Sequence, residues 1–175
     1  METIINWFKS LFRNTEETHA IANEPLQEAN ERIMEHMQEQ RVAIANLSNQ
    51  AYKDAQENLK DAGASKVLRN IGKISDILDK MCLFLDKTPS AISSARNISL
   101  FFNEKTILFA TTYHDIITHK EYNVETMQTK ERLEESIKKM ALAYQKEYEN
   151  IKRGEFADLN ADMDVVENEV NRILQ

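Results

Sequence analysis

The sequence predicts an all-α protein: an antiparallel bundle of four to five helices, with a long charged helix and an N-terminal amphipathic helix. The 175 residues include only three glycines and two prolines, which is too few for the hairpins and tight turns of a β protein. Apolar residues recur three and four positions apart along most of the chain, the period of a helix face. The breaks between these stretches are short, so consecutive helices should be antiparallel neighbours.

Residues 1–13 predict an amphipathic arm. At about 100° per residue, the apolar side chains of a helix over residues 4–12 share an arc of roughly 160°, and Lys9 and Arg13 lie on the other face. The apolar set is Ile4, Ile5, Trp7, Phe8, Leu11 and Phe12. Residues 14–24 are polar and break the period, which predicts a linker, and residues 25–175 are then the helical bundle domain.

The first long helix is expected from Leu26 to about residue 60, since Pro25 suits a helix start. Its apolar positions are sparse and form one narrow seam of Leu26, Ile33, Met37, Ile44, Leu47, Ala51, Ala55 and Leu59. A narrow seam contacts one or two neighbours. The spacing leaves open whether this helix packs in the bundle or projects from it.

Two further helices are expected after this one. Gly63 marks a break, and the helix after it has a wider apolar face of Val67, Ile71, Ile74, Leu78, Met81 and Leu85. Thr88 can cap a further helix that starts at Pro89 and continues without a breaker to about Lys120. Its aromatic side chains are expected in the core: Phe101, Phe102, Phe109 and Tyr113.

The C-terminal third predicts two helices separated at Arg153 and Gly154, which suit a helix C-terminus. The first carries a near-heptad apolar series of Leu133, Ile137, Met140, Tyr144, Tyr148 and Ile151. The second is expected to bury a stripe of Leu159, Met163, Val166, Val170 and Ile173.

Charge and cysteine content exclude some classes of function. A formal net charge of −7 argues against a nucleic-acid partner, because phosphates are bound by clustered Lys and Arg. The single cysteine, Cys82, lies in an apolar run, which predicts a buried thiol in a reducing compartment. We therefore expect a cytoplasmic protein without a membrane-spanning helix or a secretory signal, with peripheral contact at the inner face of the membrane left open.

Three stretches of the sequence share one resemblance. They are residues 95–113, ARNISLFFNEKTILFATTY, the upstream KISDILDKMCLFLDKTPS and the downstream LEESIKKMALAYQKEYENIKRGEFADLNADMDVVENEV. Together they resemble the XpaC family of bacterial proteins. This is the 5-bromo-4-chloroindolyl phosphate hydrolysis family, which is related to the TelA toxic-anion-resistance proteins. The likeness covers roughly residues 65–171, and Asn103, Glu104 and Lys105 replace the Leu-Pro-Thr of other members. It implies a role at the cell envelope in stress or toxic-anion resistance, and it implies no catalytic residue.

A calcium-loop pattern occurs near the C-terminus. Its ligand positions 1, 3, 5 and 12 are Asp158, Asn160, Asp162 and Glu169. Position 6 of such a loop needs glycine for its sharp turn, and Met163 stands there. The same residues fit an amphipathic helix with solvated acids, and we favour the helix.

Other residues weighed as metal or catalytic groups do not converge in the sequence. His114 and His119 are five apart and point about 140° away from each other in a helix, which makes them poor co-ligands. Asp115 and His119 are four apart, but no second pair of this kind completes a metal site. Arg96 could bind an anion or pair with an acid. We expect no metal, no cofactor and no catalytic residue.

The sequence therefore favours a non-enzymatic helical-bundle protein that acts by binding. Three targets stay open for the arm: its own bundle, a groove on a protein partner or another copy of the chain, and a lipid surface. The alternative is a hydrolase, or a factor associated with one, acting on phosphate esters.

Overall fold

The computed structural model describes residues 26–57, 62–119 and 123–173, which are helical except for Thr88 and Asn123 and contain no strand. The elements are α3 (Leu26–Glu57), α4 (Ala62–Lys87), the 3₁₀-helix η2 (Pro89–Ala95), the π-helix η3 (Ile98–Phe102), α5 (Asn103–His119) and α6 (Val124–Ile173). The all-α class is thus confirmed. The predicted arm and linker, residues 1–24, lie outside the described residues.

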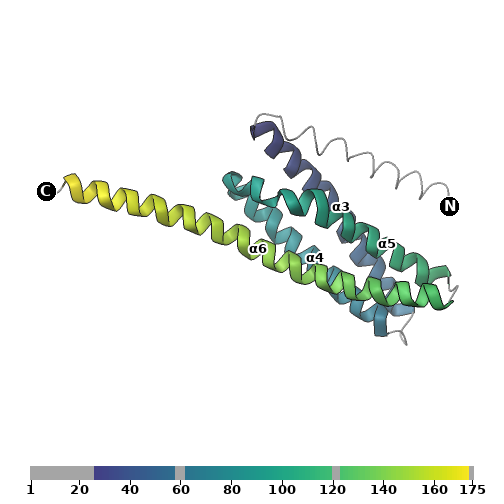
Figure 1. Cartoon of the computed structure of the whole chain (residues 1–175). Helices are drawn as coiled ribbons and strands as arrows, with labels where there is room; N and C mark the ends of the chain where they lie inside the picture. The colour runs from purple at the N-terminus through teal and green to yellow at the C-terminus, as the bar shows by residue number, and fades with distance from the viewer. Residues whose placement is uncertain (1–25, 58–61, 120–122, 174–175) are drawn as a thin grey trace.

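The four α-helices form an antiparallel bundle (Figure 1). α3 packs against α4 and α5, and α6 packs against the same two helices from the other side. The long charged helix α3 is therefore part of the bundle and does not project from it.

The seam of α3 is more continuous than its apolar residues suggested. Ile33, Met37, Ile44, Ala51 and Ala55 are buried, as predicted. Gln40 fills the gap between Met37 and Ile44, and Asp54 is buried next to Ala55; these two side chains are 4% and 6% exposed. Leu26 is exposed, contrary to the prediction, and the first buried position of α3 is Ala29.

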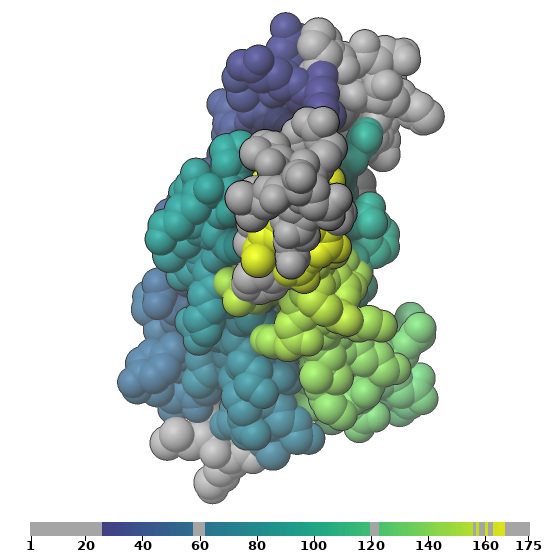
Figure 2. All heavy atoms as spheres, turned by 90° about the vertical axis from the view of Figure 1, so that its left-hand side faces the viewer, coloured from purple at the N-terminus to yellow at the C-terminus, as the bar shows by residue number. Residues whose placement is uncertain are grey.

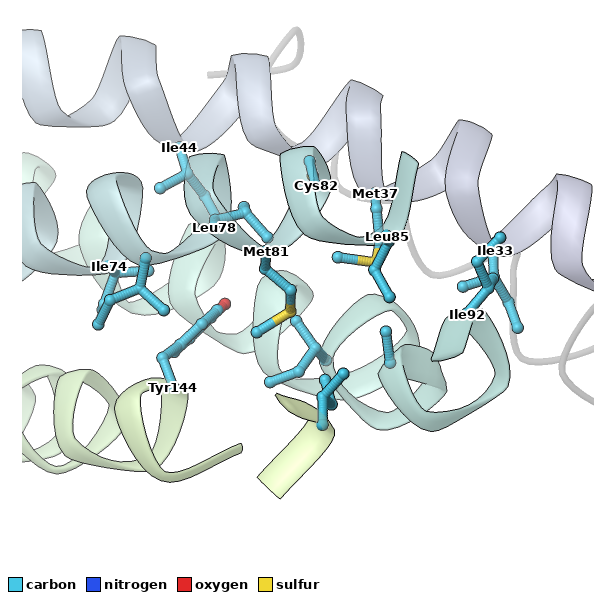
Figure 3. Close-up of a cluster of buried hydrophobic side chains, with 14 of the residues drawn as sticks. Ile33, Met37, Ile44, Ile74, Leu78, Met81, Cys82, Leu85, Ile92 and Tyr144 are labelled. Carbon is cyan, nitrogen blue, oxygen red and sulfur yellow. The ribbon is translucent and has the colours of Figure 1, made fainter. Parts of the chain in front are cut away.

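α4 provides the centre of the core. All six apolar residues predicted for its inner face are buried, together with Ile77 and Cys82. In Figure 3, Leu78 and Met81 lie between α3 and α6, close to Ile44 and Tyr144. This cluster continues through η2 and the π-helix to Ile151 at one end of the bundle, and a second cluster around Tyr113 and Ile137 fills the other end.

The helix predicted from Pro89 to about Lys120 is continuous through His119, where the described segment ends, but its hydrogen-bonding type changes along the way. Pro89 opens a 3₁₀-helix, and a π-helix follows in which the N–H of Asn103 donates to the carbonyl of Ile98, five residues earlier. A π turn adds one residue to the helical repeat, and here both Ser99 and Asn103 are buried while Phe101 is 57% exposed. The prediction of a buried Phe101 is therefore wrong, whereas Tyr113 is buried and Phe102 and Phe109 are partly buried.

The predicted break at Arg153 and Gly154 is also wrong, because α6 is one helix of 50 residues. A single glycine inside a helix costs only about 1 kcal/mol relative to alanine. No proline follows it, and good helix formers flank it. A methyl group added at Gly154 would meet nothing within 4 Å, so no tertiary contact requires a glycine there.

α6 leaves the bundle near its middle. Ile151 is buried in the core, and Ser90 Oγ donates to Glu155 Oε2 at 3.2 Å. Residues 156–173, which we call the α6 extension, continue past the other helices (Figure 1). At 1.5 Å per residue they span about 27 Å. Figure 2 views the molecule from the side on which α6 leaves the bundle. Met163 and Val166 are 60% and 62% exposed, so the predicted burial of their stripe is wrong at these positions, because no described helix reaches them.

A chain that ends at Glu155 is expected to keep the melting temperature of the full chain within about 2 °C, because solvated segments away from the core change stability by about 0.5 kcal/mol or less. Thermal unfolding followed by circular dichroism measures this. A loss of more than about 5 °C would mean that the extension packs on the bundle.

Candidate functional site

The structure offers three places where chemistry or binding could occur: a buried polar network, a groove between α4 and α6, and the α6 extension. The residues predicted to bind a partner or a membrane, Ile4, Ile5, Trp7, Phe8, Leu11 and Phe12, lie outside the described residues.

The buried polar network connects α3, the π-helix, α5 and α6. His36 Nδ1 lies 3.1 Å from Ser99 Oγ, and His36 Nε2 lies 2.9 Å from Gln40 Nε2. Asn103 then donates from Nδ2 to Gln40 Oε1 at 2.6 Å and accepts at Oδ1 from the Tyr144 hydroxyl at 2.6 Å. Six side chains are linked in all: Ser99, His36, Gln40, Asn103, Tyr144 and Thr106.

The direction of these bonds fixes the imidazole tautomer. The Gln40 amide nitrogen is a donor, so His36 Nε2 accepts, and Nδ1 carries the proton that is directed at Ser99. Thr106 Oγ1 lies 2.9 Å from the carbonyl of Phe102 and 3.1 Å from the Tyr144 hydroxyl. The bonds from Tyr144 through Asn103 and Gln40 to His36 and Ser99 thus all run in one direction.

The geometry of this network suits a role in holding the helices together. Burial raises the pKa of Tyr144, and the hydrogen bond to Thr106 opposes that rise only partly. A tyrosine that keeps its proton is a poor nucleophile. Buried amides that satisfy one another fix the register between helices, and here Gln40 and Asn103 do so at the level of the π-helix.

A second polar layer lies 14 positions further along α3. Asp54 Oδ2 lies 2.9 Å from His114 Nδ1 of α5, and Gln50 donates to Asp54 Oδ1 at 3.0 Å. Close by, buried Lys130 donates to Glu134 at 2.9 Å and sits 5.6 Å from the ring centre of Tyr113. Each core cluster therefore contains one hydrogen-bonded polar layer.

The histidines that were considered as metal ligands bond to different protein groups. His114 bonds Asp54, whereas His119 Nδ1 donates to the carbonyl of Asp115 at 2.8 Å. Within residues 26–57, 62–119 and 123–173, no three His, Cys, Asp or Glu side chains lie close enough to bind a metal ion. Residues 158–169 are helical, whereas a calcium loop wraps around its ion.

Cys82 is fully buried in the main core cluster, as predicted. Burial raises the pKa of its thiol to about 11, although the Arg41 charge acts in the opposite direction. The thiolate is the reactive form, so this cysteine is inert at neutral pH.

The free energy of unfolding is expected to fall by about 2 kcal/mol between pH 9 and pH 11 because of this thiol. The thiol of the unfolded chain ionises near pH 9.0 and that of the folded chain near pH 11. Between these values the folded state binds more protons than the unfolded state, so the free energy of unfolding falls as the pH rises. Urea unfolding of the full chain and of Cys82→Ala at both pH values measures the difference. Equal pH dependence in the two proteins would contradict it.

A groove of about 920 Å³ runs between α4 and α6. Its α4 wall is mainly basic, with Lys66, Arg69, Lys73 and Lys80, and its α6 wall carries Glu131, Glu134 and Glu135. Apolar contacts come from Ile77, Ala141 and Leu142. An anion in this groove would meet carboxylates as well as cations, which makes it a poor site for a phosphate ester.

The α6 extension carries apolar residues at regular spacing, and two of them, Met163 and Val166, are exposed. In the sequence, Phe156, Leu159, Met163, Val166, Val170 and Ile173 alternate three and four apart, the spacing of a coiled-coil seam. Asp162, Glu167 and Glu169 occupy the helical positions on either side of it. The extension contains five carboxylates and one arginine in total, so it is strongly acidic.

Sequence reasoning recognised this stripe but expected it to be covered. It missed Gln40, which falls where the three-four series of α3 skips a member between Met37 and Ile44, and Asp54, which directly precedes Ala55 of that series. That gap was the available signal, because a polar residue at a seam position often specifies pairing in coiled coils.

Comparison with protein-family models, with curated proteins and with solved structures gives no match. The resemblance to the XpaC family therefore stays a prediction. None of the helices in the described part of the chain is long and apolar enough to cross a membrane.

Proposed function

We propose that this chain is a non-enzymatic binding protein, in which the bundle is a rigid base and the α6 extension binds a helix of a partner protein. The observation that carries the proposal is the exposure of Met163 and Val166, 60% and 62%, on a helix that has left the bundle. Apolar side chains at coiled-coil spacing are stabilised by a facing helix.

The charges beside the seam specify the chemistry of that partner. In a parallel pair of two copies, Asp162 of one copy would face Glu167 of the other, and in an antiparallel pair acids would again face acids. Like charges at these flanking positions disfavour a coiled coil. The preferred partner is therefore a helix with apolar residues three and four apart and with Lys or Arg beside them.

The buried groups support binding in preference to catalysis. The network at the π-helix is occupied by mutual hydrogen bonds, Cys82 keeps its proton, and the α4–α6 groove mixes both signs of charge. The XpaC resemblance adds the expectation that this binding takes place in the bacterial cytoplasm, next to the envelope.

A pair of synthetic peptides tests the proposal. Both have leucines at alternating three and four spacing over roughly three heptads, and the flanking positions are lysine in one and glutamate in the other. The full chain is expected to bind the lysine peptide and not the glutamate peptide, more weakly as salt rises.

The chain offers a matched control, because Val165 and Val166 are neighbours of the same type with exposures of 67% and 62%. Only Val166 belongs to the seam. Val166→Lys should weaken binding of the lysine peptide roughly tenfold or more, and Val165→Lys should leave it nearly unchanged. Equal loss in both variants, or equal binding of both peptides, would overturn the proposal.

A further inference from the structure

We infer that the α6 extension has an occupant within the same chain: the N-terminal arm, residues 1–13, docks on the apolar seam of its own α6. This inference rests on the proposed function, because it identifies a helix that covers the same surface until an external partner replaces it. Three properties of the described residues and of the sequence support it.

The first property is where the described chain begins. α3 starts at Leu26, at the end of the bundle from which α6 projects (Figure 1). The linker and Pro25 together provide 12 residues, which span up to about 40 Å when extended. This reach exceeds the length of the extension, about 27 Å, so the arm can reach the seam without any change in the bundle.

The second property is complementary charge. The arm carries Lys9 and Arg13 and one acid, Glu2, whereas the extension carries five carboxylates and one arginine. Opposite net charges attract over about one Debye length, roughly 8 Å at physiological salt. The negative charge that disfavours pairing of two extensions therefore favours binding of the positively charged arm.

The third property is matching apolar spacing. Ile4, Phe8 and Leu11 are four and three apart, as are Leu159, Met163 and Val166. A short amphipathic helix binds weakly by itself, but a tether of this length gives an effective concentration in the millimolar range. A contact too weak to persist between separate molecules is then mostly formed within one chain.

Trp7 is the single tryptophan of the chain, so its fluorescence reports on the arm in the full-length protein without any label. Docking predicts emission at short wavelength and slow quenching by acrylamide. In Val166→Lys the emission should move to longer wavelength and the quenching constant should rise several-fold, because the tethered contact is lost. Val165→Lys should behave as the unmodified chain does.

Two further readouts complete the test. The Trp7 signal should be independent of protein concentration, and a photoreactive residue at position 166 should link to residues 1–13 of the same molecule. Deleting residues 1–13 should strengthen binding of the lysine peptide several-fold by removing its competitor.

The inference is overturned if Trp7 is already exposed in the unmodified chain, or if Val166→Lys leaves its emission unchanged. It is also overturned if the signal requires high protein concentration, which would indicate a second copy, or if anionic lipid vesicles change Trp7 equally in the unmodified chain and in Val166→Lys. In each case the lysine peptide can still bind at Val166, so the proposed function is judged separately.

Discussion

Replacing Asn103 with leucine is expected to lower the free energy of unfolding by about 2–5 kcal/mol, because it removes the buried donor to Gln40 Oε1 and the buried acceptor of the Tyr144 hydroxyl proton. Asn103 donates to Gln40 Oε1 and accepts from the Tyr144 hydroxyl, each at 2.6 Å. Leucine has a similar volume but can do neither. Urea unfolding monitored by circular dichroism measures the loss.

Asn97 provides the matched control for this variant. It lies six residues earlier, is exposed, and makes no side-chain capping bond at the start of the π-helix. Asn97→Leu should change stability by no more than about 0.5 kcal/mol. If Asn103→Leu were as stable as Asn97→Leu, the polar network would not be what fixes α3, α5 and α6 in register.

Replacing Leu78 with alanine is expected to cost about 2–5 kcal/mol, the range for removing a fully buried leucine from a core. Leu78 is 0% exposed and lies where α4 faces both α3 and α6 (Figure 3). A void there would remove contacts on several sides, and the surrounding helices can relax only in part.

Leu83 is the matched control on the same helix, since it is 57% exposed. Leu83→Ala should be nearly neutral in the same urea experiment. The two variants should share the same dependence on urea, because neither changes how much surface unfolding exposes. Similar losses in both would mean that the inner face of α4 has been assigned wrongly.

The helices and most of the core could be predicted because their signals are local. The apolar series on α4 and on the first half of α6 repeat at three and four positions, and their members are buried except for Tyr148, which is partly buried. Even the polar positions of α3 follow that period, as Gln40 and Asp54 show. A helix face is set by a rotation of about 100° per residue, which the sequence contains.

The π-helix and the length of α6 could not be predicted in this way. A π turn costs backbone energy that only tertiary partners can offset, and the partners of Ser99 and Asn103 are His36 and Gln40, 63 residues earlier in both cases. Gly154 is compatible with a helix end and with a helix interior, which differ by about 1 kcal/mol. Whether the stripe after it is covered depends on which other helices reach it, and spacing along one helix does not contain that information.

The proposed binding surface exists only if α6 continues straight past Gly154 and away from the bundle. Spin labels at Lys139→Cys and Asp164→Cys, in a chain that also carries Cys82→Ala, measure this directly through their dipolar coupling. The first label lies on the part of α6 that packs in the bundle and the second on the extension, and both native residues are exposed. A continuous helix places these positions about 37 Å apart, at 1.5 Å per residue. A separation below about 20 Å, as expected if the chain turned back at Gly154 and packed beside the bundle, would contradict the exposed seam and the function derived from it.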